Sequence, residues 1–441
     1  MMEVGGEHMV IRLISRFSSR VATIGVVGIG YVGLPLLLHI SRSGYRVIGL
    51  DTNEERVTLL KAHASPFSHI SSDEISESFY NVLGVSSDYS LVKECDALIV
   101  CTPTPLDEAG SPDLSYLLNA IDMIISNMRS GQLISVESTV FPGVVNEIIR
   151  PKIEASGFRL GQEAFLVYSP ERVDPGNRYY KIENTNKIVS GVTESCLELG
   201  GALYEGLGIP IVPVRSTYVA EYAKILENVY RAVNIALVNE FKTVAQVHGV
   251  DIYEVIAAAS TKPFGFSAHY PGPGVGGHCL PVDPVYLAWM ARKAGAVAKL
   301  TEVAISINSN MPKYIVEKVV SVLSNARGRV YGSKVLLLGV SYKKNVGDIR
   351  ECPSFEIIRL LARQGCAIFY SDEFVPNLTV GDVGLVLSSS SLDVEILKRV
   401  DVAVLITDHD YFDYDLILNN SLILIDARGR YESSRPNVIR A

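Results

Sequence analysis

Short apolar runs alternate with longer amphipathic runs over the first half of the chain. The apolar runs have the length of β-strands and occupy residues 23–27, 45–50, 96–101, 132–136 and 165–168. Continuous apolar runs of this kind are typical of parallel strands that are buried on both faces. Helix-like segments between such strands indicate βαβ units. The pattern therefore predicts a doubly wound α/β domain of the Rossmann type.

The same alternation returns in the last third of the chain. Residues 334–338 are an apolar run that leads into Gly339, and a helix is expected from Ser354 to about Gln364. Further strands are expected at residues 367–370, 402–406 and 421–425. This pattern predicts a second doubly wound sheet, without the full glycine signature of the first.

A single long helical pattern lies between the two halves. No helix breaker interrupts it before Gly249, and Ser216 or Thr217 can cap its start. The segment is apolar most of the way round, which favours burial between domains or against another subunit. The fold class expected is α/β, with two Rossmann-like doubly wound parallel-sheet domains joined by a long central α-helix.

The first apolar run leads directly into the sequence GIGYVG at residues 28–33. In such a signature Gly28 makes the tight turn, Gly30 lets the backbone approach a pyrophosphate, and Gly33 lets the helix pack against the strand. Asp51 ends the second apolar run, 23 residues after Gly28. An acid there can bind both ribose hydroxyls and repel a 2′-phosphate, so the pattern predicts NAD rather than NADP.

Three later strands each end in a polar loop that contains proline. These loops carry Thr102, Thr139 and Glu171. Ligands of parallel sheets bind at the carboxyl ends of the strands, so the three loops together favour one ligand crevice. Each loop taken alone could equally be a simple turn.

Three polar residues share one face of the long helix. Lys224, Asn228 and Arg231 are spaced by four and then three positions. Such a stripe is usually solvated, but a lysine and an asparagine inside so apolar a helix must be paired or used.

Residues 271–284 contain four glycines and four prolines, so they form neither a helix nor a regular strand. They present Cys279 beside His278, with Asp283 four residues on. Such a loop is either a connector or a rigid cradle for a nucleophile. In the second case, its glycines would let the backbone approach a ligand closely.

The composition of the 441 residues limits the class of protein and its partners. With 48% hydrophobic and 20% charged residues, the chain is globular. The formal net charge of −8 argues against nucleic acid as the main partner. A negatively charged ligand therefore needs a local basic pocket, which Lys343, Lys344, Arg350 and Arg428 can supply.

The six cysteines include no Cys-x-x-Cys pair, so neither a disulfide framework nor a zinc site is expected. We therefore expect no metal and a reducing, cytoplasmic location. We expect no membrane insertion, because no apolar run is long enough to cross a bilayer. Residues 1–20 place Arg12, Arg16 and Arg20 around a short apolar run. They form either a short amphipathic helix or a frayed arm.

The chain resembles the UDP-glucose/GDP-mannose dehydrogenase family from about residue 21 to 432. The segments that carry the resemblance are residues 28–35, 138–140, 169–171, 221–228, 271–283 and 339–351. The resemblance implies NAD as cofactor, a UDP-sugar as substrate, and a homodimer formed through the central helix. It implies an arm at residues 1–20, an NAD-binding domain at 21–212, a central helical dimerisation domain at 213–310 and a UDP-sugar-binding domain at 311–441.

The resemblance also implies the reaction and the residues that perform it. The C6 alcohol of the sugar is oxidised to the acid in two hydride transfers, for the synthesis of surface polysaccharide or glycan precursors. Cys279 captures the intermediate aldehyde as a thiohemiacetal, which becomes a thioester that water cleaves. The expected catalytic residues are Cys279, Lys224, Asn228, Asp283, Glu171 and Thr139.

Binding residues follow from the same match. The expected NAD contacts are Gly28, Gly30, Tyr31, Val32, Gly33, Asp51, Arg56, Thr102, Thr139, Glu171 and Arg350. The expected substrate contacts are Glu171, Arg172, Lys224, Asn228, Arg231, His269, Tyr270, Gly274, Tyr342, Lys343 and Arg428.

One departure from the family pattern bears on the substrate. Enzymes for UDP-glucose usually follow Pro-Glu with Phe-Leu, whereas Arg172 and Val173 stand here. With residues 262–266 and 269–274, this resembles the UDP-N-acetylhexosamine branch, and the UDP-N-acetyl-D-glucosamine enzymes most. UDP-N-acetyl-D-mannosamine and, less readily, UDP-glucose or GDP-mannose remain alternatives. A 3-hydroxyacid dehydrogenase and a non-catalytic NAD-binding assembly protein are remote ones.

Overall fold

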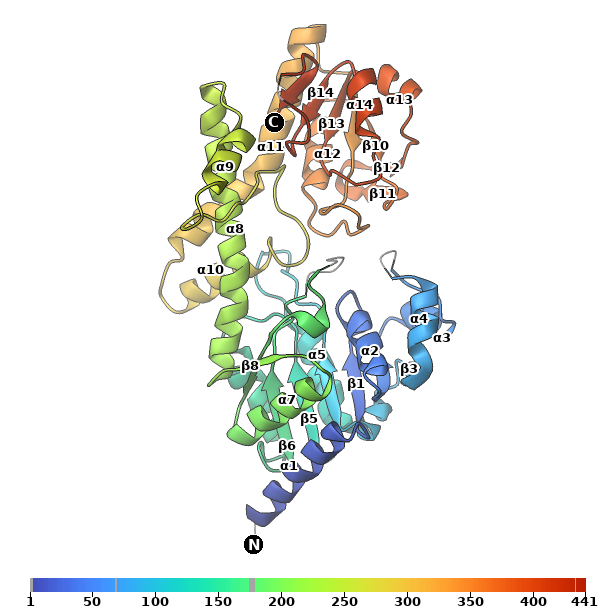
Figure 1. Cartoon of the computed structure of the whole chain (residues 1–441), viewed down its shortest axis with the longest axis vertical. Helices are drawn as coiled ribbons and strands as arrows, with labels where there is room; N and C mark the ends of the chain where they lie inside the picture. Colours follow the sequence, from blue (N-terminus) through green and yellow to red (C-terminus); the bar gives the residue numbers. More distant parts are fainter. Residues whose placement is uncertain (1–2, 68–69, 174–178, 433) are drawn as a thin grey trace. The chain divides into compact units, whose positions relative to one another are not determined.

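The computed structural model describes residues 3–67, 70–173, 179–432 and 434–441 (Figure 1). The chain divides into two compact units, Met1–Glu227 and Asn228–Ala441. The helix α8 (Thr217–Val247) contains the boundary between them. Each unit has its own β-sheet.

The first unit is built on an eight-stranded sheet with the strand order β3-β2-β1-β4-β5-β6-β7-β8. Its strands are β1 (Thr23–Val27), β2 (Arg46–Leu50), β3 (Val82–Ser86), β4 (Ala97–Val100), β5 (Gln132–Val136), β6 (Ala164–Tyr168), β7 (Lys187–Gly191) and β8 (Ile211–Pro213). Neighbouring strands are parallel except for β6 and β7. The five apolar runs of the sequence correspond to β1, β2, β4, β5 and β6, so the predicted α/β class is confirmed.

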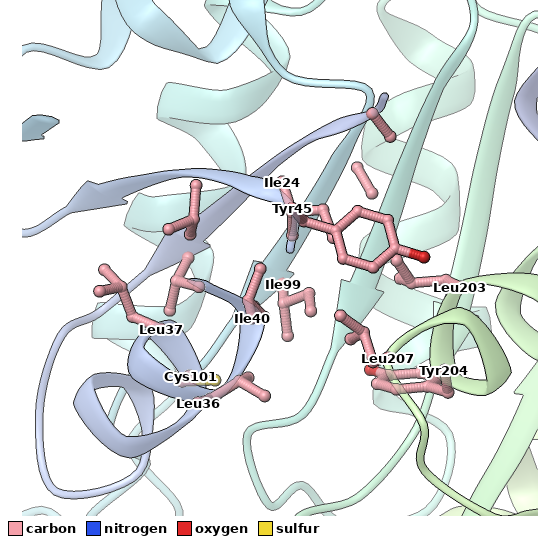
Figure 2. Packing of buried hydrophobic residues seen from close by; sticks show 14 of the residues in the cluster. Ile24, Leu36, Leu37, Ile40, Tyr45, Ile99, Cys101, Leu203, Tyr204 and Leu207 are labelled. Atoms are coloured by element: carbon pink, nitrogen blue, oxygen red, sulfur yellow. The ribbon is translucent and has the colours of Figure 1, made fainter. Parts of the chain in front are cut away.

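The helices of this unit are α1 (Glu3–Ser18), α2 (Gly33–Arg42), α3 (Glu54–Lys61), α4 (Ser72–Ser78), α5 (Ser115–Asn127), α6 (Arg150–Ala155) and α7 (Glu194–Gly206). Short helical turns add η1 (Phe79–Asn81), η2 (Tyr89–Glu94), η3 (Val144–Ile149) and η4 (Ile182–Asn184). Residues of β1 enter two buried apolar clusters, with Ile24 and Val26 in one and Val27 in the other. Figure 2 shows the first cluster, where Tyr45 and Tyr204 lie among aliphatic side chains such as Leu203 and Leu207.

The N-terminal helix α1 (Glu3–Ser18) packs on this unit. Leu13 and Phe17 of α1 are buried in the first apolar cluster. Arg16 forms an ion pair of 2.8 Å with Asp96, and Tyr45 donates to the Phe17 carbonyl oxygen at 2.6 Å. Of the two expectations, the structure has the helix and not the frayed arm.

The second unit carries a five-stranded parallel sheet with the order β10-β9-β13-β14-β15. Its strands are β9 (Lys334–Leu338), β10 (Ala367–Ser371), β13 (Val402–Leu405), β14 (Leu424–Asp426) and β15 (Val438–Arg440), and β11 (Asn377–Val380) pairs antiparallel with β12 (Leu385–Ser388). Its further helices are α9 (Ile252–Ser260), α10 (Asp283–Lys293), α11 (Lys299–Arg327), α12 (Pro353–Arg363), α13 (Val394–Arg399) and α14 (Tyr414–Asn420), with the turn η5 (Gly381–Val383). This is the second doubly wound sheet that the sequence predicts.

The helix α8 runs from Thr217 to Val247, as the absence of helix breakers predicts. The Ser216 hydroxyl accepts the Val219 N–H at 3.4 Å, and Gly249 adopts a left-handed φ of 68° beyond the end. One face carries exposed apolar side chains, namely Tyr222, Leu226, Tyr230, Leu237, Phe241 and Val244. Within this chain the helix is therefore only partly buried.

Among the residues that the structure describes, no helix is both long enough and apolar enough to cross a bilayer. Within the same residues, no group of three or more His, Cys, Asp or Glu side chains is arranged to hold a metal ion.

Candidate active site

The turn between β1 and α2 has the geometry that a pyrophosphate requires. Gly28 has a φ of 88°, and its N–H donates to the Leu50 carbonyl oxygen at 2.8 Å. A Cβ at Gly33 would lie 1.9 Å from the Gly28 carbonyl oxygen, whereas a Cβ at Gly30 would meet nothing within 4 Å. Gly33 is thus needed for packing, and Gly30 keeps space open in front of the helix N-terminus.

Asp51 follows β2 and faces this turn. One carboxylate oxygen accepts the Ile29 N–H at 2.8 Å and the Arg56 guanidinium at 2.7 Å, and the other accepts the Asn53 N–H at 2.9 Å. Asn53 caps α3, the helix that carries Arg56. The acid that the sequence assigns to a ribose therefore also fixes the glycine turn, and Arg56 lies beside it.

The loops after β4 and β5 are joined at the carboxyl ends of those strands. The Ser138 hydroxyl donates to the Thr102 carbonyl oxygen at 2.7 Å, and the Thr104 hydroxyl donates to the Thr139 carbonyl oxygen at 2.7 Å. Thr102 and Thr139 thus lie on one edge of the sheet, as the sequence predicts for a single crevice.

Glu171 follows β6 and lies in a buried polar cluster of this unit. Lys187 Nζ lies 2.9 Å from the carboxylate of Glu137 and 3.8 Å from that of Glu171. The Tyr204 hydroxyl donates to Glu137 at 2.7 Å, and the Lys224 ammonium donates to the backbone carbonyl oxygen of Glu171. The sequence alone does not identify Glu137, Lys187 or Tyr204, because they lie far apart along the chain.

Arg172 is half-buried and paired within the same unit. Its guanidinium lies 2.7 Å from the Glu227 carboxylate and donates to the Asn186 carbonyl oxygen. The substrate contact expected from Arg172 stays a prediction. Residues 174–178, which follow Val173 in the sequence, lie outside the described residues.

The glycine-rich loop of the second unit is irregular, as its composition predicts. Gly274 and Gly277 have left-handed φ values of 131° and 81°. A Cβ at Gly276 would lie 2.7 Å from Cβ of Tyr342, and one at Gly277 would lie 3.0 Å from the ring of Tyr342. The Gly277 N–H donates to the Arg350 carbonyl oxygen at 2.9 Å. Gly276 and Gly277 thus allow close packing on a neighbouring loop, a role that differs from the expected approach to a ligand.

Cys279 is half-buried and lies in the turn that leads into α10. Its carbonyl oxygen accepts the N–H groups of Val282 at 3.2 Å and Asp283 at 2.9 Å. The Asp283 side chain is buried and accepts the Asn228 amide at 2.6 Å. This hydrogen bond joins the middle of α8 to the first turn of α10. A position next to a helix N-terminus favours the thiolate of a cysteine.

The polar stripe on α8 is divided by the boundary between the units. Lys224 belongs to the first unit and Asn228 to the second, one helical turn further on. Both side chains are buried, with 8% and 3% exposure, whereas Arg231 is exposed. Lys224 and Asn228 are therefore shielded from solvent, whereas Arg231 is solvated.

His269 and Tyr270 precede the glycine-rich loop. The His269 ring lies edge-on to Tyr230 at 5.8 Å between centroids, and Tyr270 stacks on Tyr253 at 6.4 Å. Tyr270 is 58% exposed. Both aromatic side chains are thus held by other aromatic rings at the surface of the second unit, and their substrate contacts stay predictions.

The loop after β9 repeats the geometry of the first glycine turn. Gly339 has a φ of 73°, and its N–H donates to the Ser371 carbonyl oxygen at 2.9 Å. The carboxylate of Asp372 accepts the Val340 N–H at 2.8 Å and the Ser341 N–H at 3.2 Å. This loop carries Tyr342 and Lys343, the predicted substrate contacts.

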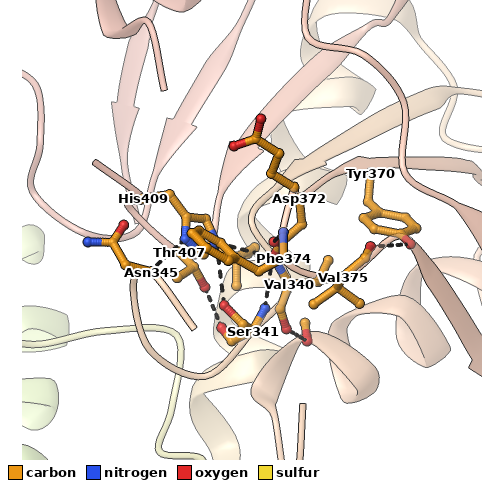
Figure 3. Close-up of polar contacts among 12 residues, drawn as sticks. Val340, Ser341, Asn345, Tyr370, Asp372, Phe374, Val375, Thr407 and His409 are labelled. Carbon is orange, nitrogen blue, oxygen red and sulfur yellow. Dashed lines mark hydrogen bonds and ion pairs between the residues drawn. The ribbon is translucent and has the colours of Figure 1, made fainter. Parts of the chain in front are cut away.

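A buried histidine holds this second turn in place (Figure 3). The His409 ring lies 3.1 Å from the Asp372 carboxylate through Nε2, and its Nδ1 accepts the Asn345 N–H at 2.9 Å. Because Nδ1 accepts this bond, Nε2 is the nitrogen that donates to Asp372. Burial raises the pKa of Asp372, but hydrogen bonds and charge from His409 and the two loop N–H groups outweigh it and lower the pKa.

Arg350 and Arg428 flank the glycine-rich loop. Arg350 forms an ion pair of 2.6 Å with Asp348, and Nε of Arg428 donates to the Ile406 carbonyl oxygen at 2.6 Å. A Cβ at Gly272 would lie 3.0 Å from the Arg428 guanidinium. The loop backbone therefore lies against Arg428, so the predicted basic residue borders the loop that carries Cys279.

The fold and these two sites define the class of protein: an NAD-dependent oxidoreductase with a second nucleotide-binding domain. Three domains of the UDP-glucose/GDP-mannose dehydrogenase family match this chain. Residues 22–208 match its NAD binding domain, residues 218–310 its central domain and residues 336–433 its UDP binding domain. The chain belongs to this family. The predictions of NAD as cofactor and of a nucleotide-sugar dehydrogenase are thereby confirmed.

Relatives with two different substrates resemble the chain closely. It is 34% identical to UDP-N-acetyl-D-glucosamine 6-dehydrogenase of Pseudomonas aeruginosa, over 80% of this chain and 83% of that protein. It is 32% identical to UDP-N-acetyl-D-mannosamine dehydrogenase of Methanocaldococcus jannaschii, over 88% of this chain and 86% of that protein. A solved structure of UDP-D-ManNAc dehydrogenase from Pyrococcus horikoshii has a TM-score of 0.84 at 29% identity, covering 95% of this chain and 98% of that one.

The glycine turn after β1 allows a test that separates folding from cofactor binding. Gly33→Ala should lower the free energy of unfolding by about 1–3 kcal/mol or more, because its Cβ would overlap the Gly28 carbonyl oxygen. Gly30→Ala should melt like the wild type but bind NAD at least about tenfold more weakly, because its Cβ would occupy the pyrophosphate space. Thermal melts and calorimetric titration with NAD measure the two effects.

Gly84→Ala is the matched control, because a Cβ there also meets nothing within 4 Å but lies on β3 at the edge of the sheet. It should change neither quantity. Wild-type NAD affinity in Gly30→Ala would contradict the assignment of the turn.

Proposed function

We propose that the protein oxidises the C6 alcohol of a UDP-N-acetylhexosamine to the uronic acid, with UDP-N-acetyl-D-glucosamine as the best candidate. The observation that carries the proposal is the position of Cys279 at the start of α10, beside the buried pair Asn228–Asp283. A simple alcohol dehydrogenase has no use for a thiol there, whereas oxidation through an aldehyde to an acid does. The substrates named for the relatives, one with UDP-N-acetyl-D-glucosamine and one with UDP-N-acetyl-D-mannosamine, support a UDP-N-acetylhexosamine.

NAD, when bound, accepts one hydride in each of two oxidation steps. The turn at Gly28, Gly30 and Gly33 would hold its pyrophosphate, and Asp51 and Arg56 would hold its ribose. Tyr31, Val32, Thr102 and Arg350 are proposed as further contacts.

Cys279 forms the covalent intermediate in the proposed mechanism. Its thiolate adds to the aldehyde carbon, and loss of the second hydride converts the thiohemiacetal into a thioester. Water then adds to the acyl carbon and the C–S bond breaks, which returns the electron pair to sulfur. Lys224 and Asn228 are proposed to stabilise the oxyanion that forms at each addition. Burial of both side chains supports this role, because the attraction between an oxyanion and a hydrogen-bond donor or cation is stronger away from water.

Asp283, Glu171 and Thr139 are proposed to hold water and move protons. Asp283 is buried and already accepts the Asn228 amide, so its contribution includes the orientation of that amide. Burial raises the pKa of Glu171, but Lys187, the Val173 N–H, Lys224 and a hydrogen bond with Glu137 outweigh it. The pKa of Glu171 is thereby lowered, so its carboxylate is ionised near neutral pH.

The second unit is proposed to bind the UDP moiety. Tyr342, Lys343 and Arg428 would contact it, and their loops are held by the Asp372–His409 pair and by the Ile406 carbonyl oxygen. Arg172 is proposed to meet the acetamido group or a phosphate, together with residues Arg231, His269, Tyr270 and Gly274. A reducing cytoplasm is the proposed location, which agrees with the absence of disulfides among the six cysteines.

A homodimer through α8 is proposed from the exposed apolar face of that helix. Leu226 is 67% exposed and Phe241 is 55% exposed, on the face that also carries Tyr222 and Tyr230. A contiguous apolar face of this kind is typical of a subunit interface.

Leu226→Lys combined with Phe241→Lys should convert the dimer to a monomer in light scattering, because two charges would be buried at the interface. Val386→Lys is the control, since Val386 is 76% exposed but lies on β12. A wild-type mass for the double variant would contradict the α8 interface.

The substrate is tested by incubating the protein with NAD and, separately, UDP-GlcNAc, UDP-ManNAc, UDP-glucose and GDP-mannose. NADH formation should be fastest with UDP-GlcNAc. Its kcat/KM should exceed that for UDP-glucose by at least about tenfold, because UDP-glucose lacks the acetamido group and would leave the polar group that binds it unpaired. A clear preference for UDP-glucose would show that the role proposed for Arg172 is wrong.

Cys279→Ala should abolish formation of the acid while NAD affinity stays at the wild-type value, because the glycine turn is untouched. Product analysis by mass spectrometry and calorimetric titration with NAD measure the two effects. Cys366→Ala is the matched control, because Cys366 is also a half-buried thiol of the second unit and should keep full activity. Acid formation at the wild-type rate in Cys279→Ala would rule out the thioester route.

A further inference from the structure

A second carboxyl group lies directly behind Glu171 in the first unit. Glu137 follows β5, is 1% exposed, and pairs with Lys187 at the start of β7. Lys187 is itself 7% exposed and lies between the two carboxyl groups, 2.9 Å from Glu137 and 3.8 Å from Glu171. The arrangement forms a continuous polar path from Glu171 into the protein interior.

Lys187 is shared between the two carboxyl groups when both are ionised. The groups that face Glu137 are Lys187, Glu171, the Tyr204 hydroxyl and the Cys101 thiol, and Lys224 lies near Glu171. The pKa of Cys101 is raised well above its usual value by burial and by the two carboxylates, so the thiol stays neutral. Glu171 thus has two ammonium neighbours whereas Glu137 shares one of them, so a proton retained in this buried cluster near neutral pH is held on Glu137.

Glu137 is the group in this pair that holds the proton more tightly. Burial raises the pKa of Glu137 to about 7, although Lys187 acts in the opposite direction. The pKa of Glu171 is instead lowered, because Lys187, the Val173 N–H and Lys224 outweigh the effect of burial. A proton that arrives on Glu171 therefore moves to Glu137 with a gain in free energy.

We propose that Glu137 accepts, through Glu171, the proton that water releases when it cleaves the thioester on Cys279. This inference rests on the proposed function, because it needs Glu171 to receive that proton. Glu137 touches neither substrate nor cofactor in this scheme. It acts through Glu171 as a positioning residue that keeps Glu171 ionised for the next turnover.

The proton and electron balance of the step is closed without a further reactant. The water oxygen bonds to the acyl carbon, the C–S bond breaks, and its electron pair returns to the sulfur of Cys279. One water proton goes to the Glu171 carboxylate, and the product leaves as the carboxylic acid. The proton then passes from Glu171 to ionised Glu137, from which it reaches solvent after the acid is released.

Glu137→Gln tests this inference, because the amide keeps the shape of the side chain but cannot take up the proton. The wild-type rate should rise through about pH 7, where Glu137 ionises. The variant should match the wild type within about twofold at pH 6 and fall about tenfold below it at pH 8.5, the size expected for loss of a proton acceptor. At pH 8.5 the variant should also release a burst of NADH, with the acyl-enzyme visible by mass spectrometry, because hydrolysis has become limiting.

Tyr204→Phe provides a second variant that keeps the carboxyl group. The hydrogen bond from Tyr204 lowers the pKa of Glu137, so its loss should shift the midpoint of the pH–rate profile upward. Tyr45→Phe is the matched control, because Tyr45 is buried in the same apolar cluster and its hydroxyl donates to the Phe17 carbonyl oxygen instead (Figure 2). It should leave the midpoint unchanged.

A ratio of wild-type to Glu137→Gln activity that stays constant from pH 6 to 8.5 would overturn the inference, because a structural defect lowers activity at every pH. Equal midpoints for Tyr204→Phe and Tyr45→Phe would also overturn it. Failure of the proposed function looks different, since the wild type itself would then oxidise none of the four nucleotide sugars.

Discussion

The hydrogen bond between Asn228 and Asp283 is the constraint on which the chemistry of the second unit depends. It joins the middle of α8 to the first turn of α10, and both side chains are buried. The turn with Cys279 ends at this point, because its carbonyl oxygen accepts the Asp283 N–H. A buried amide donates to a buried carboxylate here, so loss of this hydrogen bond would lower stability considerably. The Cys279 thiol is therefore placed by regular elements on both sides of a loop that has no regular structure itself.

The two nucleotide-binding sheets use the same turn for different purposes. Gly28 and Gly339 have φ values of 88° and 73°, and each is followed by an N–H that donates to an acid, Asp51 or Asp372. In the first turn Gly30 leaves the space in front of the helix open. In the second turn the corresponding residue is Ser341, whose hydroxyl bonds the Lys343 carbonyl oxygen at 2.9 Å. A closed turn that presents Tyr342 and Lys343 agrees with the match of this domain to a UDP binding domain rather than to a second NAD domain.

Local sequence predicts the central strands and the chemistry of single loops. It does not predict the contacts that these strands and loops make with residues distant in the sequence. The strands β1, β4 and β5 are mostly apolar and buried at every position, whereas β3 and β8 at the sheet edges have almost no buried side chains and give no such signal. Lys224 and Asn228 could be identified because polar residues in an apolar helix are costly. Glu137 could not, since it resembles a turn residue and pairs with a lysine 50 positions later in the chain. The contact of Gly276 and Gly277 with Tyr342 likewise depends on tertiary packing.

The central claim is that one thiol carries the sugar through both oxidations without release of the aldehyde. The number of NADH molecules formed from a limiting amount of UDP-N-acetylhexosamine, with excess NAD, tests it most directly. The account predicts two NADH for each sugar consumed, with the uronic acid as the only product and no aldehyde trapped by added hydroxylamine. One NADH for each sugar, with an aldehyde or ketone as the product, would contradict it.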